Sequence, residues 1–130
     1  MILLDTHVAV WTTTDKRQLS PAAATAIRNA SRAAEGVAIA SSTLWEVAMM
    51  STRGRVRLPG TLTDYLQYLE RAFIVLPITG AIAEQSMLFG GYFPKDPTDR
   101  LVAATAVAHG LALVTKDEKI RNSGALPCIW

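Results

Sequence analysis

The sequence contains a single cysteine, Cys128, among its 130 residues. One cysteine excludes an internal disulfide and a cysteine-based zinc site, and it fits a reducing, cytoplasmic setting. The sequence also lacks any apolar run near the roughly 20 residues that a membrane span needs, so we expect no membrane partner. The chain runs from Met1 straight into apolar residues, without a basic region or a cleavage site, so we expect no secretory signal.

The sequence also lacks a large excess of positive or negative charge, since the formal net charge is only +2. This value alone does not argue for a nucleic-acid partner. Half of the residues are hydrophobic and 18% are charged, which is typical of a globular chain rather than a disordered one. A chain of this length is expected to form one domain, residues 1–130, without internal repeats or linkers.

Short apolar runs alternate with helix-like segments along the chain. We expect strands at Ile2–Leu4, Val37–Ala40, Phe73–Leu76 and Leu111–Thr115, with a last edge strand at Cys128–Trp130. Helices are expected from His7 to about Thr14, Pro21 to Glu35 with Ser20 as the cap, Thr43 to about Thr52, Thr61 through Leu69, about Thr79 to Phe89, Pro97 to His109, and Asp117 to about Arg121. This alternation predicts an α/β fold with a mainly parallel sheet and right-handed crossovers.

Four acidic residues stand directly after an apolar run or at the start of a helix-like segment: Asp5, Glu46, Asp99 and Asp117. In an α/β chain such positions lie at the carboxyl edge of the sheet, where the ligand-binding crevice forms. Carboxylates gathered there repel one another and keep their charge when a cation lies between them. Oxygen ligands without paired histidines favour Mg²⁺ or Mn²⁺ over zinc. The pattern therefore predicts a divalent metal site for phosphodiester chemistry.

Each acid also has a purely structural interpretation. Asp5 and Asp117 can cap the helices that follow them, and Glu46 can complete a capping box with Thr43. The acids at the start of the 97–109 helix suit the positive end of the helix dipole. Unrelated caps need not bring their carboxylates to one point, whereas a metal site must. The combination of acids therefore favours the metal site.

Basic residues are concentrated near these acids in the sequence. Eight of the thirteen are neighbours of the acidic positions, namely Arg53, Arg55, Arg57, Lys95, Arg100, Lys116, Lys119 and Arg121. One interpretation is a mixed-charge, soluble surface. The other is a binder of phosphate backbones, which needs basic residues around an acidic, metal-filled centre. His7 is near enough to Asp5 to approach the same site, although a structural role is the simpler interpretation.

Four segments carry the acids and their neighbours. They are Leu3-Leu4-Asp5-Thr6-His7, Ser42-Thr43-Leu44-Trp45-Glu46-Val47-Ala48, Asp96-Pro97-Thr98-Asp99-Arg100-Leu101 and Leu113-Val114-Thr115-Lys116-Asp117. Together they resemble the PIN domain, and more closely the VapC toxins of prokaryotic toxin–antitoxin pairs. The resemblance runs from the first residues to about Asn122. It implies a PIN-like α/β/α sandwich around a parallel sheet and a Mg²⁺-dependent endoribonuclease, with Mn²⁺ as a substitute ion.

The resemblance also implies roles for individual residues and partners. The metal ligands and catalytic acids would be Asp5, Glu46, Asp99 and Asp117, with Asp96 as an auxiliary acid. The candidates for contacts with the RNA backbone are Arg100, Arg53, Arg55, Arg57 and Lys116. Thr98 stands where the family motif usually has an aromatic residue. The implied partners are an RNA substrate, a cognate antitoxin whose C-terminal segment occupies the acidic groove, and a second copy of the chain in a homodimer.

Other interpretations fit the sequence less well. A haloacid-dehalogenase-like phosphatase needs an acid two residues after Asp5, where this chain has His7. A response-regulator receiver needs adjacent acids after the first strand, and these are absent. The remaining alternative is a catalytically silent module of PIN fold that binds nucleic acid or protein. Metal-dependent cleavage of RNA would separate that module from a ribonuclease.

Overall fold

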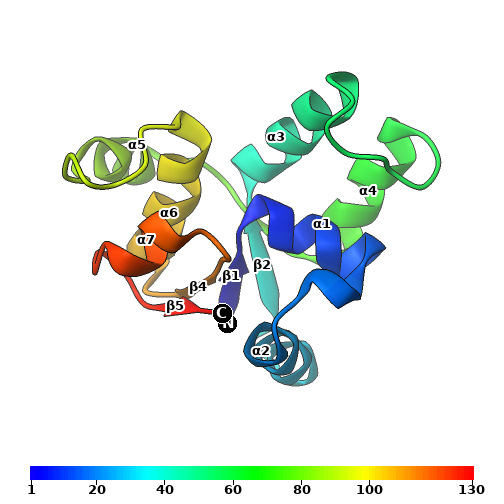
Figure 1. Ribbon diagram of the computed structural model, residues 1–130, viewed down its shortest axis with the longest axis horizontal. Helices are drawn as coiled ribbons and strands as arrows, with labels where there is room; N and C mark the ends of the chain where they lie inside the picture. Colours follow the sequence, from blue (N-terminus) through cyan, green and yellow to red (C-terminus); the bar gives the residue numbers. More distant parts are fainter.

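The computed structural model describes residues 1–130 and contains one five-stranded sheet in which all neighbouring strands are parallel. The strands are β1 (Ile2–Leu4), β2 (Val37–Ala40), β3 (Ile74–Leu76), β4 (Ala112–Val114) and β5 (Cys128–Ile129). Their order across the sheet is β3-β2-β1-β4-β5 (Figure 1). The chain therefore builds outward from β1 in both directions, and the predicted parallel α/β fold is confirmed.

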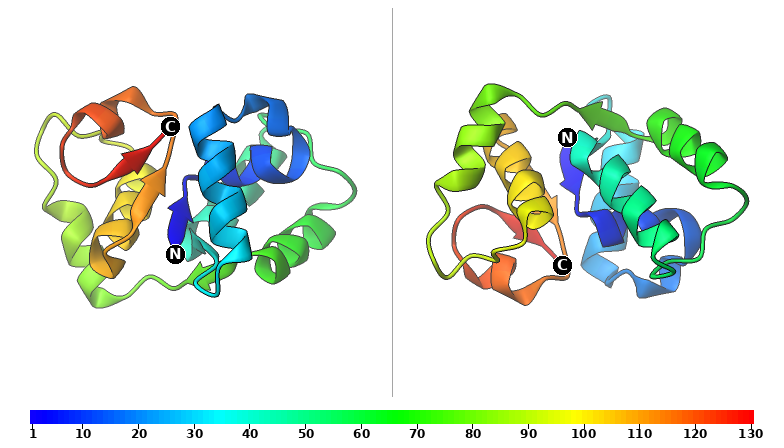
Figure 2. Two further views of the ribbon diagram at one scale, coloured as in Figure 1. Left: turned by 90° about the horizontal axis from the view of Figure 1, so that it is seen from below. Right: turned by 90° about the horizontal axis from the view of Figure 1, so that it is seen from above.

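Seven α-helices and one short 3₁₀ helix connect the strands. They are α1 (Thr6–Thr14), η1 (Lys16–Gln18), α2 (Pro21–Arg32), α3 (Ser41–Thr52), α4 (Leu62–Ala72), α5 (Gly80–Met87), α6 (Pro97–His109) and α7 (Glu118–Asn122). Figure 2 shows α1 to α4 on one side of the strands and α5 to α7 on the other. This is the expected α/β/α sandwich. None of the helices has the length and apolar character needed to span a membrane.

The sheet separates two apolar cores, because successive side chains of a strand point to opposite faces. On one face Leu4 and Val114 pack with residues of α1, α2, α3 and α4. On the other face Leu3 and Leu113 pack with residues of α6 and α7. The central strands are thus buried on both faces, as parallel strands between helices usually are. This rigid frame holds the ends of β1 and β4 next to each other.

Side-chain caps start most of the helices, and several were evident in the sequence. Ser20 accepts a hydrogen bond from the Ala23 N–H at the start of α2, directly before Pro21. Such a cap satisfies a backbone donor that has no partner inside the helix. The corresponding caps of α1, α4, α5, α6 and α7 are Asp5, Thr61, Thr79, Asp96 and Asp117.

The capping box expected from Thr43 and Glu46 is wrong. Helix α3 begins at Ser41, immediately after β2, and its N-cap is Ala40, which has no side-chain hydrogen bond to offer. Because the strand runs directly into the helix, Thr43 lies in the first turn, and its hydroxyl is 3.0 Å from the Thr6 hydroxyl of α1. Glu46 therefore lies one turn further along and is free of a capping role.

Some boundaries also differ from expectation. Helix α2 ends at Arg32 instead of Glu35, because the backbone turns extended at Ala33. The Glu35 carboxylate then forms an ion pair with the N-terminal ammonium of Met1. Helix α5 covers only Gly80–Met87, short of the expected end at Phe89.

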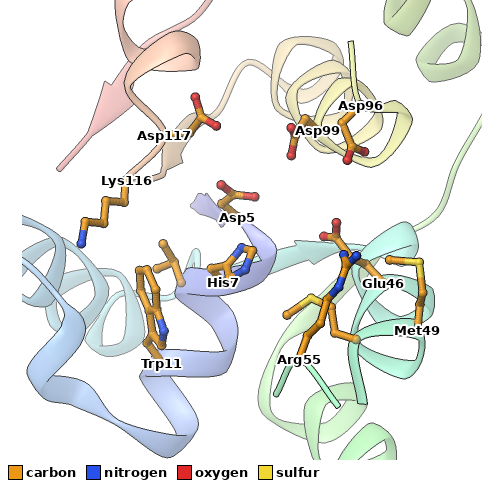
Figure 3. A pocket seen from close by; sticks show the side chains of 12 residues that line it. Asp5, His7, Trp11, Glu46, Met49, Arg55, Asp96, Asp99, Lys116 and Asp117 are labelled. Carbon is orange, nitrogen blue, oxygen red and sulfur yellow. The ribbon is translucent and has the colours of Figure 1, made fainter. Parts of the chain in front are cut away.

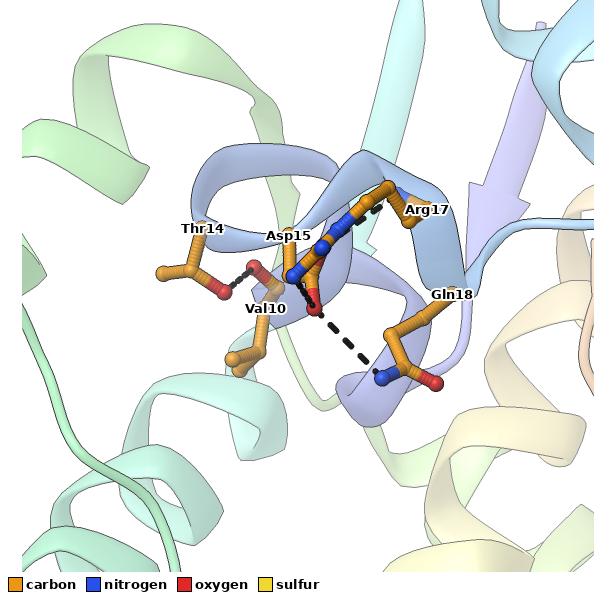
Figure 4. Close-up of polar contacts among 5 residues, drawn as sticks. All are labelled: Val10, Thr14, Asp15, Arg17 and Gln18. Atoms are coloured by element: carbon orange, nitrogen blue, oxygen red, sulfur yellow. Dashed lines mark hydrogen bonds and ion pairs between the residues drawn. The ribbon is translucent and has the colours of Figure 1, made fainter.

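Local polar contacts end α1 and redirect the chain towards α2. The Thr14 hydroxyl donates to the Val10 carbonyl at 2.7 Å, within the last turn of α1 (Figure 4). Asp15 then caps η1 and forms an ion pair with Arg17, with 2.9 Å between Oδ1 and Nε (Figure 4). Gln18 donates to the same carboxylate. This corner fixes the far end of the helix whose first residues lie at the sheet edge.

Candidate metal centre

A cavity of about 460 Å³ opens at the carboxyl ends of β1, β2 and β4 (Figure 3). Its lining comes from α1, α3, the loop after α3, the start of α6 and the loop after β4. The twelve lining residues are Asp5, His7, Val8, Trp11, Glu46, Met49, Met50, Arg55, Asp96, Asp99, Lys116 and Asp117. The structure thus brings all five acids of the expected site to one cavity. Ligands bind at this edge of open parallel sheets.

Asp5 is the most deeply buried acid of the cavity, with 8% of its surface exposed. Its carboxylate accepts hydrogen bonds from the Thr6 N–H at 2.8 Å and from the Thr115 hydroxyl at 2.7 Å. Burial raises the pKa of the Asp5 carboxyl, and the hydrogen bonds from Thr115 and Thr6 oppose that rise. Asp5 is therefore held in one orientation at the end of β1.

Asp117 is the second acid on the sheet side of the cavity. It caps α7 by accepting from the Ile120 N–H at 2.9 Å. Its own N–H donates to the Thr115 hydroxyl at 3.1 Å, while that hydroxyl donates to Asp5. Thr115 therefore connects the two acids. Thr115 was not among the expected site residues, although it is the last residue of the apolar run that leads to Asp117.

Three acids come from the helices on the other side of the cavity. Carboxylate oxygens of Glu46, Asp96 and Asp99 all lie within 4.8 Å of one another. Asp96 was expected to be auxiliary, yet it belongs to this tight group. Thr98, the second residue of α6, places its hydroxyl 2.6 Å from a Glu46 oxygen and 2.7 Å from an Asp96 oxygen.

The environment of Asp99 opposes a negative charge. Burial, followed by the neighbouring Asp5, Asp96, Glu46 and Asp117 carboxylates, raises the pKa of Asp99 to about 7. No side-chain or backbone group donates a hydrogen bond to its carboxylate. The pKa of Asp96 is lowered instead, first by hydrogen bonding with the Thr98 side chain, which Asp96 shares with Glu46, and then by the backbone N–H groups of Thr98 and Asp99. Adjacent carboxylates with such different affinities for protons are frequent at functional sites.

None of these acids forms an ion pair with a lysine, arginine or histidine side chain. The two ion pairs of the structure join Met1 to Glu35 and Arg17 to Asp15, away from the cavity. Carboxylates packed this closely without ion pairs offer the hard oxygen ligands that Mg²⁺ and Mn²⁺ prefer. The donor set therefore fits a divalent cation of this class.

The basic residues expected near the site separate into two groups. Arg55 and Lys116 line the cavity, and the Lys116 ammonium lies 5.7 Å from the centre of the Trp11 ring. His7 lines the same cavity and is exposed. Arg53 and Arg57 are exposed outside the lining.

Arg100 has a different position from the one expected of a phosphate contact. Its guanidinium donates to the Pro94 carbonyl at 2.8 Å and to the Ser86 and Phe89 carbonyls at 3.3 Å each. It also lies over the Phe93 ring, 5.8 Å from the ring centre. These contacts attach the loop before α6 to the helix. The geometry favours a structural role for Arg100 over the expected contact with RNA.

The chain is similar to known proteins over almost its whole length. A model of the PIN domain family matches residues 2–125. The chain is 36% identical to Ribonuclease VapC22 of Mycobacterium tuberculosis over 121 residues, which cover 93% of this chain and 90% of the relative.

Solved structures share the fold at lower identity. A toxin–antitoxin complex from Klebsiella pneumoniae matches with a TM-score of 0.68 and 20% identity, over 97% of this chain and 95% of the other. VapBC2 from Rickettsia felis, bound to a promoter DNA fragment, matches with a TM-score of 0.70 and 15% identity, over 98% and 97% of the two chains. With the acid-lined cavity at the sheet edge, the sequence matches show that this chain belongs to the PIN domain family, as a homologue of a VapC ribonuclease.

Proposed function

We propose that the protein is a Mg²⁺-dependent endoribonuclease, with Mn²⁺ as a substitute ion, and the toxin of a toxin–antitoxin pair. The observation that carries this proposal is the gathering of five carboxylates in one cavity, none of which forms an ion pair. The similarity to a protein named a ribonuclease supports RNA as the substrate. The proposal treats residues 1–130 as a single PIN domain.

In this proposal four acids hold the ion and carry the catalytic chemistry: Asp5, Glu46, Asp99 and Asp117. Asp96 assists from the start of α6. A divalent ion held there would supply a more acidic bound water and would stabilise charge on the phosphate. Asp99 has to lose its proton before it can act as a ligand, since a protonated carboxyl offers little to a cation.

The basic residues of the cavity bind the RNA backbone in this proposal. Arg55 and Lys116 are placed to contact phosphates, because both line the cavity and neither forms an ion pair. Arg53 and Arg57 extend the basic surface along the loop after α3. The carbonyl contacts of Arg100 make it the weakest of the predicted candidates.

Two protein partners belong to the proposal. The first is an antitoxin, because structural neighbours of this chain are toxin–antitoxin complexes. The second is another copy of the chain. Large apolar side chains are exposed at Trp45, Ile78, Met87 and Leu88, on α3 and around α5, and such residues are common at interfaces. Sedimentation of the purified protein tests for the dimer.

A cytoplasmic location is proposed from the single cysteine.

The proposal is tested by incubating total RNA with the purified protein in Mg²⁺, in Mn²⁺ and in EDTA. Cleavage that needs the ion and disappears in Asp99→Asn supports the ribonuclease. We expect products with 5′-phosphate and 3′-hydroxyl ends. Folded wild-type protein that binds Mn²⁺ but cleaves no RNA would instead favour the alternative, a silent module that binds nucleic acid or protein.

A further inference from the structure

Thr98 connects the two helices that supply the acids of the helix side. It is the second residue of α6, and its side chain is buried, with 8% of the residue exposed. Its hydroxyl oxygen lies 2.6 Å from Oε2 of Glu46 on α3 and 2.7 Å from Oδ1 of Asp96, the N-cap of α6. The contact with Glu46 joins residues 52 positions apart in the sequence.

A threonine hydroxyl has one proton, so it can donate to only one of these two carboxylates at a time. Asp96 Oδ1 already accepts the Thr98 backbone N–H at 2.9 Å, the bond that caps α6. Glu46 accepts no other hydrogen bond in the structure. When the hydroxyl donates to Glu46, it supplies the only hydrogen bond that this carboxylate accepts, whereas for Asp96 it adds to a bond that is already present. Loss of the hydroxyl therefore leaves Glu46, but not Asp96, without a donor.

We propose that Thr98 is a positioning residue, whose hydroxyl holds the Glu46 carboxylate in the orientation needed for metal binding. The proposal rests on the ribonuclease function proposed above. A free glutamate side chain has several rotatable bonds, and fixing it costs conformational entropy. Thr98 reduces the entropy that Glu46 loses on metal binding, because the hydrogen bond already restricts Glu46 in the folded protein. The Thr98 side chain is itself restricted, since it is β-branched, buried and located in the first turn of α6.

A simpler role for the hydroxyl is local: it would only support the cap of α6 through Asp96. The two roles predict different results. A local cap affects the stability of α6 and leaves metal affinity unchanged once the protein is folded. A positioning role affects metal affinity, and it does so through Glu46. Groups that orient metal ligands typically contribute a factor of 10 to 100 in affinity.

The test measures the dissociation constant of Mn²⁺ by electron paramagnetic resonance, with melting curves in EDTA as the record of folding. Thr98→Val removes the hydroxyl and keeps the shape, and we expect it to weaken Mn²⁺ binding roughly 10-fold. Thr98→Ser restores the hydroxyl and should bind Mn²⁺ within about twofold of the wild type. If Thr98→Val does not fold, Thr98→Ala removes the same hydroxyl with less bulk beside the acids.

Thr105→Val is the matched control. Thr105 is a fully buried threonine of the same helix, and its hydroxyl donates to the Leu101 carbonyl instead of an acid. We expect this variant to lose some stability and to keep the wild-type affinity for Mn²⁺. Equal losses of affinity in the Thr105 and Thr98 variants would overturn the proposal, because they would reflect a general loosening of α6.

A double-mutant cycle with Glu46→Ala tests whether the effect passes through Glu46. With Glu46 absent, Thr98→Val should change Mn²⁺ affinity by less than about twofold. A full 10-fold effect in that background would overturn the positioning role. An unchanged affinity for Mn²⁺ in Thr98→Val would also overturn the positioning role. The proposed ribonuclease function would still stand in that case if the wild-type protein cleaved RNA. A wild-type protein that binds no Mn²⁺ would refute the metal-dependent function and this inference with it.

Discussion

The two sides of the acidic cavity are built differently. On the sheet side, Asp5 and Asp117 each cap a helix and each accept a backbone hydrogen bond, from Thr6 and Ile120. On the helix side, Asp96 caps α6, whereas Glu46 and Asp99 cap nothing. Helix capping therefore explains Asp5, Asp117 and Asp96 and leaves Glu46 and Asp99 unexplained. Asp99 lies in the first turn of α6, where the helix dipole is its only structural support.

The difference separates what the fold needs from what the site needs. A helix cap stabilises the fold whether or not a metal is present. A half-buried carboxylate without a donor, surrounded by other carboxylates, destabilises it, and Asp99 is in that position. Residues that cost stability in this way are a common feature of functional sites. The helix side is thus the part of the cavity that depends most on a bound cation.

The largest effect should come from removing the charge of one ligand. Asp99→Asn and Asp5→Asn are each expected to reduce RNA cleavage by at least roughly 10² to 10³-fold, because each removes a charge that the transition state depends on. Gel-based cleavage rates with Mg²⁺ measure this. Glu84→Gln changes an exposed acid of α5 outside the cavity and should cleave at the wild-type rate. Full activity in either aspartate variant would remove that residue from the mechanism.

The next effect is on stability as a function of pH. The pKa of Asp99 is raised from 3.8 to about 7 in the folded protein. A raised carboxyl pKa contributes stability below pH 3.8, and that contribution is lost as the pH rises through about 7. We therefore expect the melting temperature in EDTA to fall over this range, and the stabilisation by Mn²⁺ to grow over the same range.

Asp99→Asn supplies the control for this pH dependence. The amide does not titrate, so the fall in melting temperature between pH 4 and pH 7 should be smaller in the variant than in the wild type. Two results would show that Asp99 does not cause the pH dependence. One is a wild-type melting temperature that rises between pH 4 and pH 7, and the other is the same fall in the wild type and in Asp99→Asn.

A smaller effect separates capping acids from the others. At Asp5, alanine should be less stable than asparagine by about 1 kcal/mol, because asparagine keeps the cap of α1 and alanine loses it. At Asp99 the same two replacements should differ little, since its carboxylate accepts no hydrogen bond. Chemical denaturation of the four variants in EDTA measures both differences. Equal differences at the two positions would mean that the two sides of the cavity are alike.

The smallest expected effect concerns the basic residues. Arg55→Ala or Lys116→Ala should weaken RNA binding and reduce the salt dependence of the affinity by about 0.7 in the log–log slope, as expected for one lost phosphate contact. Binding of an RNA oligonucleotide to the Asp99→Asn protein at several salt concentrations measures this without cleavage. Arg57→Ala, outside the cavity lining, serves as the comparison and should change the slope less.

Much of this architecture could be predicted from the sequence because it depends on local patterns. The apolar runs of β1 and β2 and the cap of α2 at Ser20-Pro21 follow from neighbouring residues alone. The gathering of the acids could also be predicted, since parallel strands place their carboxyl ends at one edge. The start of α3 could not, because a strand that runs directly into a helix leaves no capping signal at Ala40.

The hydroxyl groups that organise the acids were missed for a different reason. Thr115 donates to Asp5 across 110 residues of sequence, and Thr98 reaches Glu46 across 52. Local sequence patterns do not predict these contacts, because the contacts form only when the strands and helices pack together. Arg100 illustrates the same limit, since its place beside Asp99 suggested RNA whereas its contacts are with backbone carbonyls.

The carboxylates of this cavity are expected to hold a divalent cation. Anomalous scattering of Mn²⁺ in crystals of the wild-type protein would locate that cation. We predict a peak in coordination contact with carboxylate oxygens of Asp5 and Asp99, and no peak there in Asp99→Asn. A cavity without Mn²⁺ at saturating concentration, or a peak only at surface acids outside it, would contradict the account.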